Sequence, residues 1–277
     1  MNRKTKEFIR SVIPTRLLDK ISRASLFGNT YGIRFCGDYN SWAQAAAAST
    51  GYGAQEILDR TFEAAQKVKS GDAAFERDGV TFDEREYNFP LVWALIRSAV
   101  RHGRLHVLDF GGSLGSVYFQ SRHLIEPLRS LKWAIIEQPS HVEVGKREFS
   151  NEELSFHCTI EEACKNERFD VLLLSGVLQC LPDPMGFLDS VLGRRIPSVV
   201  LDRTPFMTNG TTRLTIQHVP EWIYSASYPS WFFSEKELLG EIVKQYDEIA
   251  EWPALDRHHP QGGRAEYRGF LFELRKQ

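Results

Sequence analysis

The pattern of apolar and polar positions divides the chain into two parts that meet near Gly103. Over residues 39–100, apolar side chains recur at helical spacing, so this stretch is expected to form helices. The last of them is predicted over 89–101, with Pro90 in its first turn, where a missing amide hydrogen costs nothing, and a glycine after its end. Residues 1–102 are therefore predicted to form a helical extension.

After Gly103, short apolar runs alternate with amphipathic stretches, which is typical of a parallel sheet with crossover helices. The expected strands are Leu105–Phe110, Lys132–Glu137, Leu154–Phe156, Val171–Ser175 and Ser198–Asp202. The expected helices lie near Ser116–Arg129, His141–Phe149, Ile160–Asn166 and Pro184–Leu192. Because such crossovers are right-handed, the fold class is α/β, with a doubly wound, Rossmann-like sheet.

The last third of the chain departs from this alternation. Residues 203–233 are rich in proline and aromatic side chains and are expected to form an insertion. A helix is predicted to start at Ser234, with Glu237 completing a capping box. Two further strands are expected, near Glu248–Trp252 and Tyr267–Leu274. Residues 103–277 would then form one domain around a mostly parallel seven-stranded sheet that ends in an antiparallel strand.

Composition narrows the class of protein. The 277 residues are 42% hydrophobic and 25% charged, as expected of a globular chain with a substantial core. The formal net charge of −2 argues against nucleic acid as a partner, because phosphate backbones are bound by strongly basic faces. None of the four cysteines forms a C-x-x-C pair, so they are interpreted as reduced thiols of a cytoplasmic protein without a metal site. The pair His258-His259 is interpreted as part of a solvated turn.

No apolar run approaches the ~20 residues that cross a bilayer, and no signal peptide is evident. The segment over residues 3–23 is basic and mildly amphipathic. A solvated lead-in helix accounts for this pattern, and so does peripheral contact with an anionic membrane surface. The oligomeric state does not follow from the sequence.

The candidate chemistry begins at a glycine-rich turn directly after the first strand of the sheet. It reads Asp109-Phe110-Gly111-Gly112-Ser113-Leu114-Gly115. Glycines let a ligand approach the backbone closely, and the following helix directs its free N–H groups towards an anionic group. The absence of a G-K-[ST] sequence excludes a P-loop. A structural turn and a nicotinamide dinucleotide site remain alternatives for the turn taken alone.

Two carboxylates help to decide what the glycine-rich turn binds. Asp109 ends the first strand two residues before Gly111, where dinucleotide-binding folds usually carry an apolar residue. Glu137 closes the second strand, and a carboxylate there can accept hydrogen bonds from both ribose hydroxyls of a nucleoside. The alternative for Glu137 is a solvated strand end. Together the two acids favour a cofactor with both an amino group and a ribose.

These residues resemble those of class I S-adenosylmethionine-dependent methyltransferases. More narrowly, the chain is similar to a poorly characterised bacterial family of methyltransferases with the motif D-F-G-G-S-L-G. The similar stretches are Gly37–Trp42, Tyr87–Pro90, the glycine-rich turn, Trp133–Pro139, Ser175–Leu181, Asp202–Phe206 and Ala226–Trp231. Members of that family often appear beside enzymes of sugar-polymer synthesis. The resemblance implies the fold and the cofactor but no settled substrate, and this association points to a glycan. We expect a small-molecule or glycan acceptor, methylated at oxygen.

The resemblance also implies roles for individual residues. S-adenosylmethionine would be the cofactor, with its ammonium at Asp109, its ribose at Glu137 and its carboxylate at the glycine-rich turn. The glycines of that turn are Gly111, Gly112 and Gly115. Ser175 and Gly176 would line the methionine part. Ser113 departs from the broader family, because a glycine usually stands there, and this substitution weakens the expectation of tight cofactor binding.

An oxygen acceptor usually needs a base within hydrogen-bond reach. Asp202, at the end of the fifth strand, and His218, in an alternating apolar run, are the candidates for catalysis. His218 shares a strand face with apolar neighbours, so a packed histidine is an equal interpretation. Aromatic residues of the insertion are expected to wall an acceptor pocket or to pack in the insertion's own core: Tyr224, Tyr228 and Trp231.

Two other functions fit the same fold. A nicotinamide-dependent oxidoreductase is disfavoured by Asp109 and by the antiparallel end of the sheet. A non-catalytic nucleotide-binding module is compatible with Ser113 and with the lack of an obvious base.

Overall fold

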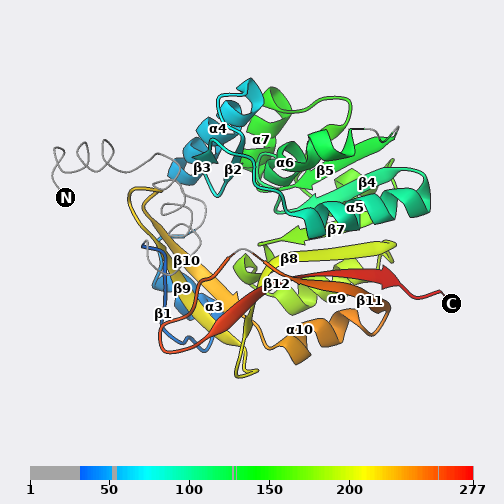
Figure 1. The fold of residues 1–277 in the computed structure, drawn as a ribbon. Coiled ribbons are helices and arrows are strands. Elements are labelled where there is room, and N and C mark those ends of the chain that lie inside the picture. Colours follow the sequence, from blue (N-terminus) through cyan, green and yellow to red (C-terminus); the bar gives the residue numbers. More distant parts are fainter. Residues whose placement is uncertain (1–31, 52–54, 127, 129, 255, 277) are drawn as a thin grey trace.

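A seven-stranded sheet with helices on both faces forms the centre of the computed structural model (Figure 1). The structure describes residues 32–276 except 52–54, 127, 129 and 255. The strand order is β11-β12-β8-β7-β4-β5-β6, and β12 runs antiparallel to both of its neighbours. The strands are β4 (Leu105–Phe110), β5 (Leu131–Ile136), β6 (Leu154–His157), β7 (Val171–Ser175), β8 (Ser198–Met207), β11 (Tyr246–Pro253) and β12 (Ala265–Leu274). The α/β fold class expected from the sequence is thus confirmed.

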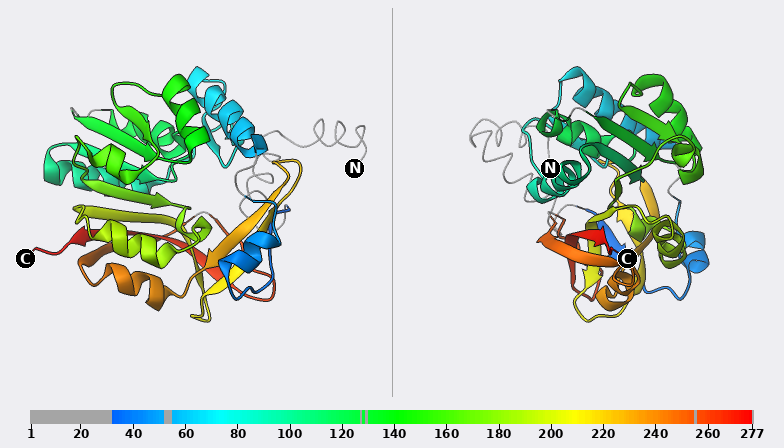
Figure 2. Two further views of the ribbon diagram at one scale, coloured as in Figure 1. Left: turned by 180° about the vertical axis from the view of Figure 1, so that it is seen from behind. Right: turned by 90° about the vertical axis from the view of Figure 1, so that its right-hand side faces the viewer.

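Each face of this sheet is covered by its own set of helices (Figure 2). On one face lie α5 (Phe89–His102), α6 (Ser116–Ile125) and α7 (Pro139–Glu148). On the other lie α8 (Ile160–Cys164), α9 (Pro184–Leu192) and α10 (Glu235–Ile242). Successive residues of β5 alternate between the two cores, with Trp133 in the first and Ala134 in the second. Burial on both faces explains why these strands are nearly continuous apolar runs.

The insertion after Asp202 is more regular than its composition suggested. Strand β8 continues five residues into it, to Met207, and β9 (Arg213–Val219) and β10 (Ala226–Phe232) form a hairpin. The N-terminal part contributes β1 (Arg34–Cys36), which pairs antiparallel with β9. This three-stranded sheet stands beyond the carboxyl ends of the central parallel strands (Figure 1). Segments far apart in the sequence therefore meet beside the edge where ligands of such folds bind.

The N-terminal part before the central sheet contains helices, as its pattern predicted, and also three short strands that it did not, β1 among them. Its further elements are α3 (Trp42–Ala47), α4 (Gln55–Ser70), β2 (Phe75–Arg77) and β3 (Val80–Phe82). Strands β2 and β3 form a hairpin that packs against α4 and α6. The basic segment over residues 3–23 lies outside the described residues, so its expected membrane contact stays a prediction. Within the described part, no helix combines the length and apolarity that crossing a membrane requires.

The helix ends test the sequence interpretation in detail. Pro90 lies in the first turn of α5, and Gly103 ends this helix in the left-handed conformation at φ 69°, as predicted. The capping box at α10 is not formed, because the Ser234 side chain makes no capping hydrogen bond. Instead, the Ser234 amide donates to Thr212 Oγ1 at 2.8 Å, and that hydroxyl donates to Glu237. A side chain from the loop before β9 thus replaces the local cap.

Close packing of α7 on β6 makes Gly145 a sensitive position. A Cβ atom there would lie 2.4 Å from the ring of Phe156, which is buried. We expect Gly145→Ala to lower the free energy of unfolding by about 1–3 kcal/mol, because the ring cannot yield in a filled core. Gly240→Ala in α10 is the matched control, since nothing lies within 4 Å of its Cβ position. That change should be neutral or stabilise by up to about 1 kcal/mol. Urea denaturation followed by circular dichroism measures both, and equal effects would contradict the packing argument.

Candidate functional site

A cavity opens at the carboxyl ends of β4, β5 and β7, with about 840 Å³ of empty space that is partly open to solvent. Its lining comes from the turn after β4, the end of β5 and the residues just after it, the residue after β6 and the loop after β7. The lining residues are Phe110, Gly111, Ile136, Glu137, Gln138, Pro139, Cys158, Gly176, Val177, Cys180 and Leu181. Mostly apolar walls with a few polar groups are typical of a small-molecule site.

The turn after β4 depends on two of its glycines. Gly111 has φ 74°, and a Cβ atom there would lie 2.4 Å from Val177. A Cβ atom at Gly112 would lie 2.6 Å from the Asp109 carboxylate. Ser113 has φ 53°, a left-handed conformation that a side chain makes costly. The turn therefore brings backbone, rather than side chains, to the edge of the cavity.

Asp109 lies beneath this turn and does not line the cavity. It is 1% exposed, and Trp133 Nε1 donates to its Oδ2 at 2.9 Å. Burial raises the pKa of Asp109 to about 7, although the indole hydrogen bond opposes the shift. Its carboxylate lies against Gly112, where a side chain would collide with it. Asp109 is therefore placed to support the turn from below and to add its charge there when ionised.

Glu137 lines the cavity and is fixed by two backbone amides. Ser113 N donates to its Oε1 at 3.2 Å, and Gln138 N donates to its Oε2 at 2.8 Å. The first of these bonds joins the end of β5 to the glycine-rich turn after β4. Since each carboxylate oxygen has a second lone pair, the group can still accept from a ligand. Glu137 and Gly111 thus meet in one cavity, as the sequence predicted.

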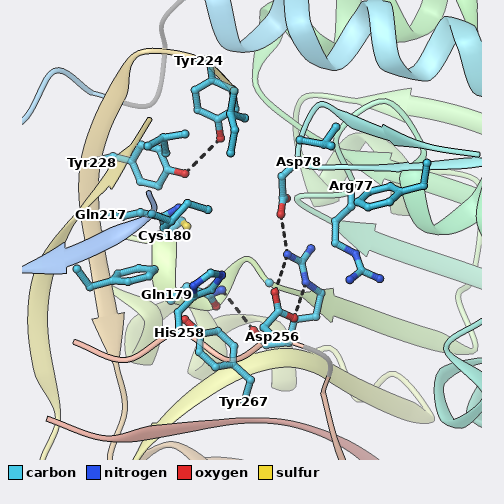
Figure 3. A pocket seen from close by; sticks show the side chains of 18 residues that line it. Arg77, Asp78, Gln179, Cys180, Gln217, Tyr224, Tyr228, Asp256, His258 and Tyr267 are labelled. Atoms are coloured by element: carbon cyan, nitrogen blue, oxygen red, sulfur yellow. Dashed lines mark hydrogen bonds and ion pairs between the residues drawn. The ribbon is translucent and has the colours of Figure 1, made fainter. Parts of the chain in front are cut away.

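A second cavity, narrow and partly open to solvent, adjoins the first and shares Gly176 and Cys180 with it; the empty space in and around it is about 820 Å³ when open solvent is included. It lies between the three-stranded sheet of β1, β9 and β10 (the small sheet), the β2–β3 hairpin and the segment before β12. Its polar and aromatic side chains face one another (Figure 3). Its aromatic lining residues are Phe35, Phe82, Tyr224, Tyr228 and Tyr267. Its polar lining residues are Arg77, Asp78, Gln179, Arg203, Gln217, Asp256 and His258.

Arg203 ties three segments together at the floor of this second cavity. Its guanidinium binds both carboxylate oxygens of Asp256, at 3.0 and 3.1 Å, and Asp78 Oδ2 at 2.7 Å. Burial alone would raise the pKa of Asp256, but the guanidinium lowers it below its usual value. Arg203 itself adopts φ 53° at the point where β8 enters the insertion. The ion pairs thus connect β8 with the β2–β3 turn and with the segment before β12.

The two side chains predicted for catalysis are not brought together. Asp202 is 2% exposed and accepts hydrogen bonds from Asn88 at 3.0 Å, Ser175 at 3.2 Å and Trp252 at 3.1 Å. Burial raises the pKa of Asp202. Asp202 and Ser175 line a third, smaller cavity and lie outside the two described above. The hydrogen bonds of Asp202 therefore link β8 to the N-terminus of α5, to β7 and to β11.

His218 lies on the wrong face of β9 for the second cavity. Its neighbours Gln217 and Val219 line that cavity, whereas Leu214 and Ile216, which share the face of His218, pack against Ala45 of α3. Alternation along a strand explains this outcome. The packed interpretation of His218 agrees with its surroundings, and the structure gives its catalytic role no support.

Several lining residues were not found from the sequence. His258, interpreted as part of a solvated turn, is instead buried at 9% exposure between the small sheet and β12. Tyr224 and Tyr228 line the second cavity as expected, but Trp231 donates to the Leu181 carbonyl and stacks on Trp42. Among the described residues, no three histidine, cysteine or acidic side chains form a metal-binding group.

Comparison with known proteins gives similar folds and no family. No family model matches the sequence. No curated protein matches it either. Among solved structures, the N-terminal domain of EvdMO1, studied in the presence of S-adenosylhomocysteine and D-fucose, is 13% identical with a TM-score of 0.47. This likeness covers 80% of this chain and 100% of that one.

Two further structures are similar over comparable lengths. The N-methyltransferase NodS of Bradyrhizobium japonicum is 14% identical, with a TM-score of 0.44 over 79% of this chain and 100% of that one. The 1,6-didemethyltoxoflavin-N1-methyltransferase of Burkholderia thailandensis is 17% identical, with a TM-score of 0.42 over 79% of this chain and 88% of that one. Because all these likenesses are distant, the function proposed below rests on the site itself.

Proposed function

We propose that this protein is a methyltransferase that uses S-adenosylmethionine to methylate a small-molecule or glycan acceptor at oxygen. The observation that carries the proposal is the meeting of Glu137 and Gly111 in a cavity that continues, through Gly176, into a second cavity. A donor site and an acceptor site must adjoin if a methyl group is to pass between them by in-line displacement.

The first cavity suits the nucleoside of the cofactor. The fixed carboxylate of Glu137 would accept hydrogen bonds from the ribose hydroxyls, and the apolar walls at Ile136 and Val177 would contact the adenine. The methionine part would extend along Gly111 towards Gly176. Gly112, Gly115 and Asp109 shape the turn that this part would follow.

The second cavity suits a hydroxylated acceptor. Aromatic faces such as Tyr228 pack against C–H groups, while the amides of Gln179 and Gln217 offer both donors and acceptors to hydroxyls. The charges of the two lining arginines are balanced by Asp78 and Asp256. A neutral, polyhydroxylated acceptor is therefore favoured over a strongly anionic one.

Ligand-induced stabilisation tests the proposal directly. The melting temperature of the purified protein is measured with S-adenosylmethionine, with S-adenosylhomocysteine and with NAD, and tritium transfer from labelled S-adenosylmethionine to an extract of the source cells is followed. We expect both adenosyl ligands to raise the melting temperature, NAD to have no effect, and label to appear in a small-molecule or glycan fraction. Stabilisation by NAD alone would indicate an oxidoreductase, and tight S-adenosylhomocysteine binding without transfer would indicate a binding module.

A further inference from the structure

We propose that His258 is the catalytic base that takes the proton from the acceptor hydroxyl. The inference rests on the proposed function, because it assigns a role within the second cavity. His258 lies in the segment between β11 and β12, and its ring is placed between Phe35, at 5.7 Å, and Tyr267, at 6.1 Å between ring centroids. Figure 3 shows this imidazole among the side chains that line the cavity.

The hydrogen-bonding state of His258 is the first observation. Its Nδ1 is buried and has no hydrogen-bond partner within the described part of the chain. Buried polar atoms are nearly always paired, so an unpaired imidazole nitrogen beside a cavity calls for an explanation. A ligand that donates to this ring supplies one. The two aromatic neighbours would keep the ring in position without occupying its nitrogens.

The protonation state of the ring is the second observation. Burial lowers the pKa of His258 below its usual 6.5. The charged and titratable groups that act on it are Asp256, Arg203, Asp78 and His259, and their opposing effects leave the pKa lowered. The imidazole is therefore neutral near pH 7 and able to accept a proton.

The other titratable groups in the second cavity are poor bases. Asp256 has both oxygens bound to Arg203 and a lowered pKa, so it remains ionised and paired. Burial raises the pKa of the Cys180 thiol to about 12 and raises the pKa of the hydroxyls of Tyr224 and Tyr267, which keeps these three groups protonated. Asp78 is mostly exposed and paired with Arg203. His258 remains as the one neutral base among these groups.

The step balances without a further reactant. The acceptor O–H proton moves to a ring nitrogen of His258 while an oxygen electron pair forms the new bond to the methyl carbon. The bond from that carbon to sulfur breaks, and its electron pair stays on sulfur, which leaves a neutral thioether. The imidazolium then returns its proton to water.

Nuclear magnetic resonance of the intact protein with nitrogen-15 histidine tests the assignment. The His258 signals, assigned through contacts to Phe35 and Tyr267, are followed through the histidine titration range without ligand, with S-adenosylhomocysteine and with S-adenosylmethionine. We expect a pKa below 6.5 in the free protein. We also expect a pKa about one unit lower with S-adenosylmethionine than with S-adenosylhomocysteine, because a sulfonium charge nearby disfavours the imidazolium.

Substitution gives a second readout. His258→Asn should retain S-adenosylhomocysteine affinity within about twofold and reduce labelled-methyl transfer by about 100-fold or more. His102→Asn is the matched control, because His102 lies in the last turn of α5 and lines none of the three cavities, and this change should leave transfer unchanged. A His258 pKa at the usual 6.5 in the free protein, or a pKa that is the same with both ligands, would overturn the inference while leaving the proposed function intact. If neither ligand stabilises the protein, the proposed function fails and the inference fails with it.

Discussion

Replacement of Glu137 by alanine is expected to lower the affinity for S-adenosylhomocysteine by about 100-fold, because charge-assisted hydrogen bonds contribute about 1.5–3 kcal/mol each. The carboxylate that would accept from the ribose is also the group that ties the turn at Ser113 to the end of β5, at 3.2 Å. The variant loses the hydrogen bonds to the ribose and also the hydrogen bond that holds the turn, and each loss lowers the affinity. Isothermal titration calorimetry of the two proteins measures the difference.

Glu143→Ala is the control for this change. Glu143 is exposed on α7, the helix that begins just after Glu137, and it lines none of the three cavities at the carboxyl edge. Its replacement should leave the affinity unchanged within about twofold. An affinity for Glu137→Ala close to that of the wild-type protein would show that the ribose does not bind at this carboxylate.

Replacement of Asp109 by asparagine is expected to stabilise the ligand-free protein at pH 8 by about 2–4 kcal/mol. The pKa of Asp109 is about 7 in the folded state, against an ordinary value of 3.8. Between these values the folded protein holds a proton that the unfolded chain releases, so stability falls as pH rises from about 4 to about 7 and stays low above. Asparagine cannot ionise and still accepts from the Trp133 indole.

Thermal and urea unfolding from pH 4 to pH 8 measure this dependence. Glu76, whose burial raises its pKa to about 7 as well, should leave a residual slope of the same sign in the variant. Asp189→Asn on the exposed surface of α9 is the control and should leave the pH dependence unchanged. A wild-type protein whose stability rises between about pH 4 and pH 7 would contradict the assignment of a protonated, buried Asp109.

The central sheet could be predicted because its strands are buried on both faces and therefore appear as apolar runs. The predicted β4 and β7 agree with the structure at both ends, and the turn from Asp109 to Gly115 follows β4 as expected. The contact between that turn and Glu137 also follows from the fold, since the carboxyl ends of neighbouring parallel strands meet at one edge.

The acceptor side could not be predicted, because it depends on contacts between distant segments. Strand β1 is only three residues long and owes its place to pairing with β9. The Arg203–Asp256 pair joins residues that no local pattern connects. His258 is surrounded by polar residues and turn signals in the sequence, and its burial comes from Phe35 and Tyr267. For His218, alternation alone does not say which face of β9 borders a cavity, so the sequence left the packed and the catalytic interpretations open.

The most direct test of the account is a crystal structure of the protein with S-adenosylhomocysteine. We expect the adenosyl group in the cavity beside Val177, both ribose hydroxyls within hydrogen-bond distance of the Glu137 carboxylate, and the thioether near Gly176 at the entrance to the second cavity. A nucleoside bound elsewhere, or bound in this cavity with its ribose away from Glu137, would contradict it.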